Sequence, residues 1–261
     1  MRRLLIVAGI CVLALVTASV SQAQSKDPFN GFYVGGNIGG SFSRVSARTT
    51  TVFSPTGYFN ITSVPAIAAA GAQSLSLNGF TGGGQVGYNY SADHFMVGIE
   101  VDFNSLSATG SKSVTAIYPC CVTTGFTVSQ TATTKWMATV RPRVGYVRGR
   151  FLFYGTVGGA LGDINYRATF VDTFATPIPA TEHGGTTQNR LGWVAGGGAE
   201  YSLRHHWSIK GEYLYATFSH ATALSTNLTA FAGPIPFPSN FFVHTAYVHA
   251  HVVRGGVNYT F

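Results

Sequence analysis

Eight segments of this chain alternate between apolar and polar residues with a period of two. In HFMVGIEVDF (94–103), the acids Glu100 and Asp102 lie opposite an apolar face of five residues. Similar alternation occurs at 32–42, 80–90, 136–146, 151–161, 191–201, 207–215 and 253–261. Alternation over about ten residues is the signature of a β-strand with one apolar face. The pattern therefore predicts an all-β protein of eight strands.

The connections between these segments alternate in length. The short ones are near 91–93, 147–149 and 202–205. The long ones run roughly over 44–78, 106–133, 162–188 and 219–244; they are rich in Ser, Thr and Pro and show no strong period. Antiparallel neighbours joined by short turns at one end and long loops at the other are typical of a transmembrane β-barrel. We expect an antiparallel up-and-down barrel with four long outer loops.

The charges on the polar faces indicate which face is inside. There are four acids and four bases: Glu100, Asp102, Glu200, Glu212, Arg141, Arg143, Lys210 and Arg254. Uncompensated charge away from water is costly, so equal numbers favour a charge network inside a closed barrel. Numerous glycines on the same faces fit the narrow interior of eight strands. The alternative is a soluble lipocalin-type barrel, which has its apolar face inside.

Aromatic residues stand at both ends of the apolar faces. Trp136 and Trp193 mark the long-loop end, whereas Trp207, Tyr259 and Phe261 mark the short-turn end. Two such levels predict the aromatic girdles of a membrane barrel. A closed barrel has no free edge, so the last strand can end at Phe261. We expect the short turns and both termini on the periplasmic side.

The first 23 residues have the features of a signal peptide. Arg2 and Arg3 precede an apolar stretch at 4–16, and Ser21 to Ala23 form a small-x-small cleavage pattern. The predicted domains are thus a signal peptide, 1–23, and a barrel, 24–261. Removing the two arginines would lower the net charge from +7 to +5. The basic residues form no run, which excludes a typical nucleic-acid surface.

Three other groups carry weaker indications. Cys120 and Cys121 are adjacent, and we interpret them as small loop residues rather than as a vicinal or intermolecular disulfide. His249 and His251 share a face, which suggests interfacial histidines more than a metal site. The long loops offer His183 beside Glu182, but no nucleophile and base are spaced for catalysis. We therefore predict no enzyme activity, no metal and no cofactor.

The ordered set of strands resembles a known family. The segments that carry the resemblance are FNGFYVGGNIGGSF (29–42), FTGGGQVGYNY (80–90), VGIEVDF (97–103), TVRPRVGY (139–146), FLFYGTVGGAL (151–161), WVAGGGAEYSL (193–203), WSIKGEYLY (207–215) and VRGGVNYTF (253–261). Together they are similar to the small porin-family or outer-membrane immunogenic proteins of Gram-negative bacteria, which are OmpA-like eight-stranded barrels. Pro142 departs from the pattern because it removes a ladder donor, so a bulge or a missing hydrogen bond is expected there.

The resemblance implies a structural outer-membrane barrel that supports envelope integrity and surface presentation. Its expected partners are outer-membrane lipids, lipopolysaccharide and the barrel-assembly machinery, which the C-terminal strand would engage; nucleic acid is excluded. One alternative is a narrow porin-like channel for small solutes or ions. The other is an adhesin that recognises host or surface ligands through its outer loops.

Overall fold

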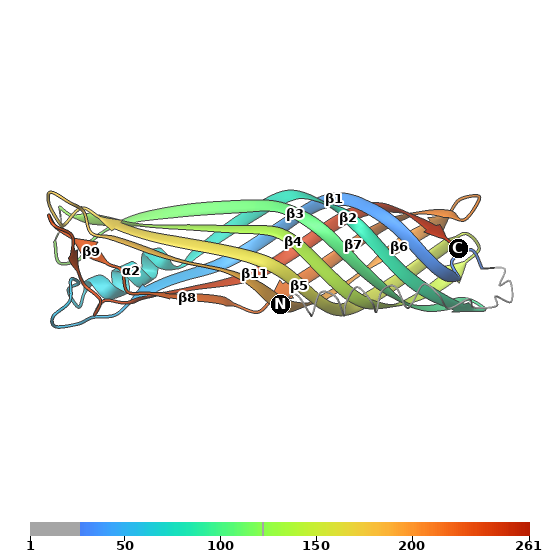
Figure 1. Ribbon diagram of the computed structural model, residues 1–261, viewed down its shortest axis with the longest axis horizontal. Helices are drawn as coiled ribbons and strands as arrows, with labels where there is room; N and C mark the ends of the chain where they lie inside the picture. The colour runs from blue at the N-terminus through green and yellow to red at the C-terminus, as the bar shows by residue number, and fades with distance from the viewer. Residues whose placement is uncertain (1–26, 122) are drawn as a thin grey trace, which may run out of the picture.

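The chain forms one long barrel of antiparallel strands, seen from the side in Figure 1 with its long axis horizontal. The computed structural model describes residues 27–121 and 123–261. The predicted signal peptide, 1–23, lies outside these residues. The β-elements are β1 (Gly31–Thr51), β2 (Gln73–Ala92), β3 (Phe95–Ile117), β4 (Gly125–Arg148), β5 (Phe151–Asp172), β6 (Thr181–Ser202), β7 (Trp207–Phe218), β8 (Ala221–Ser225), β9 (Thr229–Ala230), β10 (Ile235–Pro236) and β11 (Phe242–Thr260).

Eight strand positions close into a ring, as the sequence predicted. Each of β1 to β6 pairs with the next strand, and β11 pairs with both β7 and β1. β8 pairs with β11 beyond the end of β7, so it continues the seventh position after a break at 219–220. Where β7 pairs with both β6 and β11, the ring has no free edge, which is the condition for strands to cross hydrocarbon. The eight-stranded antiparallel barrel is thereby confirmed.

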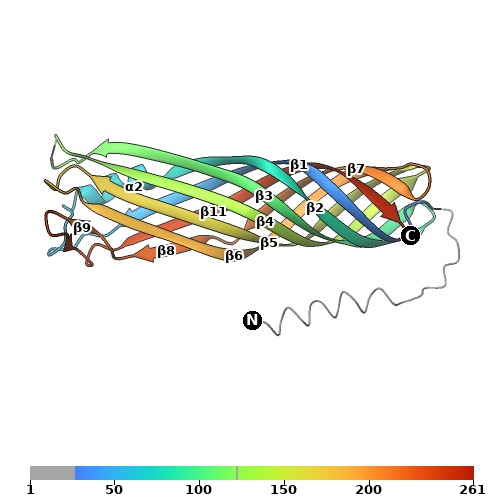
Figure 2. The same ribbon diagram turned by 45° about the horizontal axis from the view of Figure 1, so that its top comes forward.

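The two ends of the barrel differ. At one end, which we call the turn end, short connections join β2 to β3, β4 to β5 and β6 to β7, and the C-terminus lies there (Figure 1). At the opposite end, the outer end, lie the longer connections and the helix α2 (Ser63–Gly71) (Figure 2). Within the described residues, no helix has the length and apolar character to cross a bilayer.

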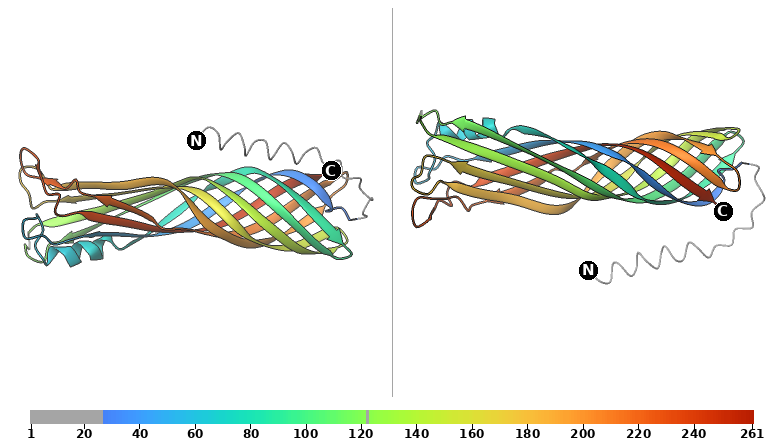
Figure 3. Two further views of the ribbon diagram at one scale, coloured as in Figure 1. Left: turned by 60° about the horizontal axis from the view of Figure 1, so that its bottom comes forward. Right: turned by 90° about the horizontal axis from the view of Figure 1, so that it is seen from above.

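The strands reach far beyond the segments that the sequence predicted. The four long connections exist, but the bounds expected for them were wrong. They are confined to 52–72, 118–124, 173–180 and 226–241, apart from the short elements α2, β9 and β10. The remaining residues extend the barrel toward the outer end, as the views in Figure 3 show. We call this part the extension.

The extension was missed because its polarity is reversed. In the half near the turn end, the wall is apolar and the interior polar. On β1, the reversal falls between Phe42, 55% exposed on the wall, and Val45, fully buried inside. Arg44 and Arg48 then face outward in place of apolar residues. The same change on the other strands gives an apolar interior that includes Leu77, Leu106, Ile164, Tyr166 and Val248.

Two irregularities interrupt the pairing of β4 with its neighbours. Against β5 the register shifts between Thr134 and Met137 of β4, and against β3 it shifts between Ser105 and Ala108 of β3. Because a bulge places two successive residues on one side, Lys135 is exposed beside Trp136 on the outer wall. In the described pairing of β4 with β5, the rungs of Arg141 and Pro142 are missing, while the register on either side is unchanged. The pairing with β5 is therefore interrupted at the proline, and no bulge accompanies the interruption.

The cysteines differ from our interpretation of them. Cys120 and Cys121 form a vicinal disulfide in the β3–β4 turn. Adjacent thiols in one tight turn need no long-range closure to meet, so spacing alone gave no reason to prefer two free residues. The bond closes only a local ring and does not link separate strands.

Candidate functional site: the charged interior

The eight charged residues predicted for the interior come together in the half of the barrel near the turn end. None is more than 5% exposed. They are supplied by β3 (Glu100 and Asp102), β4 (Arg141 and Arg143), β6 (Glu200), β7 (Lys210 and Glu212) and β11 (Arg254). Each strand positions its residues by alternation, since every second side chain points inward.

Arg141 is the centre of this cluster. Its Nη2 lies 2.5 Å from Glu100 Oε1 and 2.8 Å from Asp102 Oδ2, and its Nη1 lies 3.0 Å from Glu212 Oε1. Its Nε donates to Thr139 Oγ1 at 2.9 Å. One guanidinium thus bridges three carboxylates from β3 and β7. The planar fork of arginine suits several simultaneous acceptors, which a lysine could not match.

A second arginine closes the turn-end side of the cluster. Arg143 pairs with Glu100 and Glu200, each at 3.2 Å. Its guanidinium carbon lies 3.9 Å from the centre of the Tyr154 ring, a cation–π contact. Tyr33 donates to Glu100 Oε2 at 2.7 Å. The aromatic contacts fill space around the ion pairs that water would otherwise occupy.

The remaining two bases complete the neutralisation. Lys210 Nζ lies 2.9 Å from Glu100 Oε2. Arg254 Nη2 lies 2.6 Å from Glu212 Oε2 and 3.2 Å from Asp102 Oδ2. Every one of the four acids therefore contacts at least one base. Glu200 depends on Arg143 alone, so removing that arginine would leave a buried carboxylate without a base partner.

Three buried amide side chains extend the network toward the turn end. Asn258 Nδ2 donates to Glu200 Oε1 at 2.8 Å, and Gln85 Nε2 donates to Asn258 Oδ1 at 2.8 Å. Asn37 Nδ2 in turn donates to Gln85 Oε1 at 2.5 Å. The alternation placed these amides on inward faces, but their short, uncharged side chains gave no separate signal.

Inward-facing glycines allow the backbones of neighbouring strands to approach closely. At Gly83, a Cβ would lie 2.0 Å from Phe103 O, and at Gly196 it would lie 2.1 Å from Tyr213 O. Because backbone atoms cannot give way cheaply, both positions require glycine. Interior glycines are thus part of how eight strands enclose several charged side chains.

Toward the outer end, the interior is closed by apolar packing. Leu214 and Val194 are fully buried next to the level of the charge network, and the core continues through Leu106 and Leu77 to Tyr166. Tyr166 donates to Gln130 Oε1 at 2.6 Å, so its hydroxyl is satisfied within the core. The arrangement is suited to filling and stiffening the barrel.

The five aromatic residues predicted for the girdles all lie on the outer wall. Trp207 and Phe261 are 47% and 59% exposed at the turn end, and Tyr259 lies 5.2 Å from each, measured between ring centres. Farther along the barrel, Trp136 stacks on Phe103 and Trp193 packs edge-on against Tyr215. Amphipathic rings at two levels suit the two interfaces of a bilayer.

The histidines and the loop acids are used within the structure. His249 hydrogen-bonds Tyr215 and Thr217 on the wall, and His251 hydrogen-bonds Tyr213. Buried Glu182 accepts from His244 at 3.1 Å and also contacts Ser225, which ties β6 to β8 and β11. Among the residues that the structure describes, no group of three or more His, Cys, Asp or Glu could hold a metal ion.

Comparison with known proteins agrees with this architecture. Residues 10–261 match the family model for the outer membrane protein beta-barrel domain. The chain is 31% identical over 194 residues to the 31 kDa outer-membrane immunogenic proteins of Brucella melitensis and Brucella suis, an alignment covering 74% of this chain and 70% of each relative.

Solved structures give more distant likenesses. The outer membrane protease OmpT from Escherichia coli has a TM-score of 0.44 and 8% identity, covering 92% of this chain and 100% of that one. OprG from Pseudomonas aeruginosa has a TM-score of 0.39 and 12% identity, covering 89% of this chain and 97% of that one. These scores are too low for an argument about activity.

Proposed function

Because the chain belongs to the outer-membrane β-barrel family, we propose that it is a closed structural barrel that supports the outer membrane and presents its outer end at the cell surface. The observation that carries this proposal is the filled interior. Ion pairs occupy the half near the turn end, and an apolar core occupies the extension.

A diffusion channel is less consistent with this packing. An eight-stranded barrel has an interior only wide enough for side chains. Arg141 and Arg143 are at most 1% exposed, so water does not reach the ion pairs through the described part of the barrel. Apolar Leu214 and Val194 stand beyond them, where a passing ion would lose its hydration without compensation. Conduction would need both the ion-pair network and the apolar residues beyond it to rearrange.

The wall supports anchoring of the barrel in a bilayer. We propose that Trp207, Tyr259 and Phe261 lie at the periplasmic interface and that Trp136 and Trp193 lie at the outer interface. The C-terminal strand would present its aromatic end to the barrel-assembly machinery. Lipids, with lipopolysaccharide in the outer leaflet, are the partners that this surface favours.

Planar-bilayer conductance tests the proposal. Refolded residues 24–261 are compared with an Arg141→Ala/Arg143→Ala variant, and folding of each sample is verified by heat-modifiable migration. We expect no steady single-channel steps from the wild-type barrel. Regular steps from the wild-type protein that change size in the variant would reject the closed barrel and establish a channel through the charged interior.

A further inference from the structure

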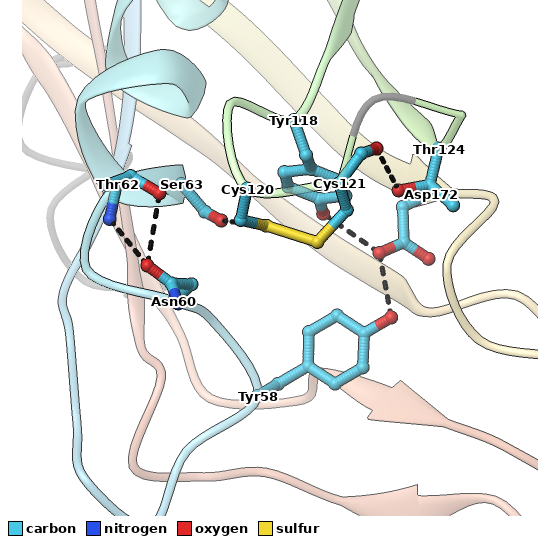
Figure 4. Close-up of a disulfide and its surroundings, with 9 residues drawn as sticks. All are labelled: Tyr58, Asn60, Thr62, Ser63, Tyr118, Cys120, Cys121, Thr124 and Asp172. Atoms are coloured by element: carbon cyan, nitrogen blue, oxygen red, sulfur yellow. Dashed lines mark hydrogen bonds between the residues drawn. A yellow bond between two sulfur atoms is a disulfide. The ribbon is translucent and has the colours of Figure 1, made fainter.

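A cavity of about 530 Å³ lies at the outer end, away from the charged interior. One side is the loop after β1, from Phe53 to Asn60, together with Ser63 at the start of α2. The other side is the β3–β4 turn, with Phe174 from the β5–β6 connection. Figure 4 shows the disulfide of this turn facing Tyr58 and Ser63. Three connections distant in sequence thus form one enclosure.

Hydrogen bonds connect the described residues of the disulfide turn. Cys121 N donates to Tyr118 O at 3.2 Å, and Thr124 N and Oγ1 both donate to Cys121 O at 2.9 Å. Ser63 Oγ contacts Cys120 Sγ at 4.0 Å. Since oxidation leaves neither sulfur with a proton, the pair offers an apolar, polarizable surface with no thiol donor. The turn therefore presents sulfur to the cavity in place of a flexible side chain.

Asp172 does not line the cavity itself, but it connects the two walls by hydrogen bonds. Its Oδ2 accepts hydrogen bonds from Tyr58 and Tyr118, both at 2.8 Å (Figure 4). Its Oδ1 accepts from Ala180 N at 3.1 Å. Burial, reinforced by the carboxylate, raises the pKa of both phenols well above the usual tyrosine value. Both hydroxyls therefore stay protonated and donate to the aspartate, which leaves their oxygen lone pairs as acceptors.

The chemistry of the lining limits what can bind. No ionised side chain lines the cavity, which disfavours phosphates, sulfates and cations. Phe53 and Phe174 are 45% and 46% exposed and supply apolar ring faces beside the disulfide. Ser54, Asn60 and Ser63 supply hydroxyl and amide groups on the same enclosure. The complementary ligand is neutral, with an apolar face and a rim of hydroxyls.

We propose that this cavity binds a neutral saccharide, whose ring stacks on Phe174 and Phe53 against the Cys120–Cys121 disulfide while its hydroxyls bond to the Ser, Asn and Tyr oxygens. The volume lies within the 300–1,000 Å³ usual for small-ligand sites. The position is also apt, because the outer end meets surface polysaccharide of the same cell or glycans of another cell. The site is independent of whether the barrel conducts.

The test is ligand-observed saturation-transfer NMR on the full folded chain in detergent. The probes are glucose, galactose, N-acetylglucosamine and their disaccharides, with glucuronate as the charged counterpart. We expect saturable binding of at least one neutral sugar and much weaker binding of glucuronate. Absence of binding by every neutral probe, or equal binding of glucuronate, would overturn the proposal.

Variants locate the binding. Phe174→Ala and Phe53→Ala should each weaken it about tenfold, because each removes a stacking face. Ile61→Ala is the matched control, since Ile61 is 63% exposed at the same end but does not line the cavity. Cys120→Ser/Cys121→Ser should also weaken binding, and reduction of the wild-type disulfide should reproduce that loss. Equal affinity in Phe174→Ala and wild type would exclude this site.

Separate arms identify the source of the sugar. Isolated surface polysaccharide of the producing bacterium is tested in one arm, and neutral animal-cell glycans in the other. Binding in either arm that depends on Phe174 supports the proposal and names the source. Binding only of an aromatic peptide, with no sugar bound in any arm, would assign the cavity to a protein partner and reject the saccharide.

Discussion

Arg141 on β4 and Glu212 on β7 are 71 residues apart in sequence, yet the arginine Nη1 donates to the glutamate Oε1 at 3.0 Å inside the barrel. Arg141→Ala would leave three buried carboxylates short of a partner, and losing one member of a buried pair costs about 3–5 kcal/mol. We expect a loss of that size in urea unfolding followed by tryptophan fluorescence. Arg167→Ala, an exposed arginine of the extension, is the control. A change below roughly 0.5 kcal/mol in Arg141→Ala would show that the pairs do not stabilise the barrel.

Interior and lipid-facing glycines should respond differently to the same substitution. Gly83→Ala would force a Cβ against Phe103 O, whereas the space around Gly159 is empty to 4 Å. Overpacking of this kind costs about 1–3 kcal/mol. We expect Gly83→Ala to lower the folded fraction on heat-modifiability gels, with Gly159→Ala unchanged or slightly more stable. Equal behaviour of the two variants would contradict the close packing of the interior.

Leu77 tests whether the extension is a packed barrel. It is fully buried, whereas its neighbour Ser76 faces outward. Leu77→Ala should destabilise the protein by about 2–5 kcal/mol, the usual cost of such a cavity. Limited proteolysis should then cut within 44–51 or 73–79 faster than in wild type. Ser76→Ala should match wild type, and rapid cleavage of both segments in the wild-type protein would mean that they are loops.

Alkaline pH should weaken the extension through its buried tyrosines. Burial raises the pKa of Tyr166 to about 12, above the value near 10 of an unfolded tyrosine. The stability from the neutral phenol is present below about pH 10 and is lost as the pH rises toward 12, because the unfolded chain gives up its proton first. Titration of the phenolate absorbance should show a transition near pH 12 that is absent in Tyr166→Phe, while Tyr58 and Tyr118, whose pKa values are also raised, stay protonated there. A Tyr166 that titrates with the exposed tyrosines would contradict its burial.

Phe261 tests the proposed role of the C-terminal strand in assembly. Its ring packs on Phe32 and Tyr259 at the turn end. Phe261→Ala should lower the amount of folded barrel in the outer membrane of cells, while refolding in detergent keeps its yield. Val257→Ala, on the same face of β11, is the matched control. An equal loss in both assays would assign Phe261 to stability alone.

The predictable part of this protein is the part in which polarity and period agree. The face of β3 that holds Glu100 and Asp102 was evident from alternation, and equal numbers of acids and bases indicated an enclosed interior. The contacts among these residues were not predictable. They depend on register between strands such as β4 and β7, which are not neighbours in the ring.

The extension was hidden by small residues. Around Val45 and Ala47, the inward face consists of Ser, Val, Ala and Thr, and the outward face of Arg, Ser and Thr. The contrast in polarity between the two faces is weak, and it has the opposite sign from the half of the barrel near the turn end. A sign of this reversal was present in Val248, Ala250 and Val252, which occupy the face where the half near the turn end has polar residues.

The reversal of polarity along the strands also fixes how deep the barrel sits in the membrane. If the barrel slid outward, apolar Phe42 would enter water; if it slid inward, Arg44 and Arg48 would enter hydrocarbon. Both displacements are penalised, so the preferred height is set by a single boundary shared by the strands. A mutation that moved this boundary on several strands together would raise or lower the saccharide cavity relative to the membrane while leaving its internal geometry intact.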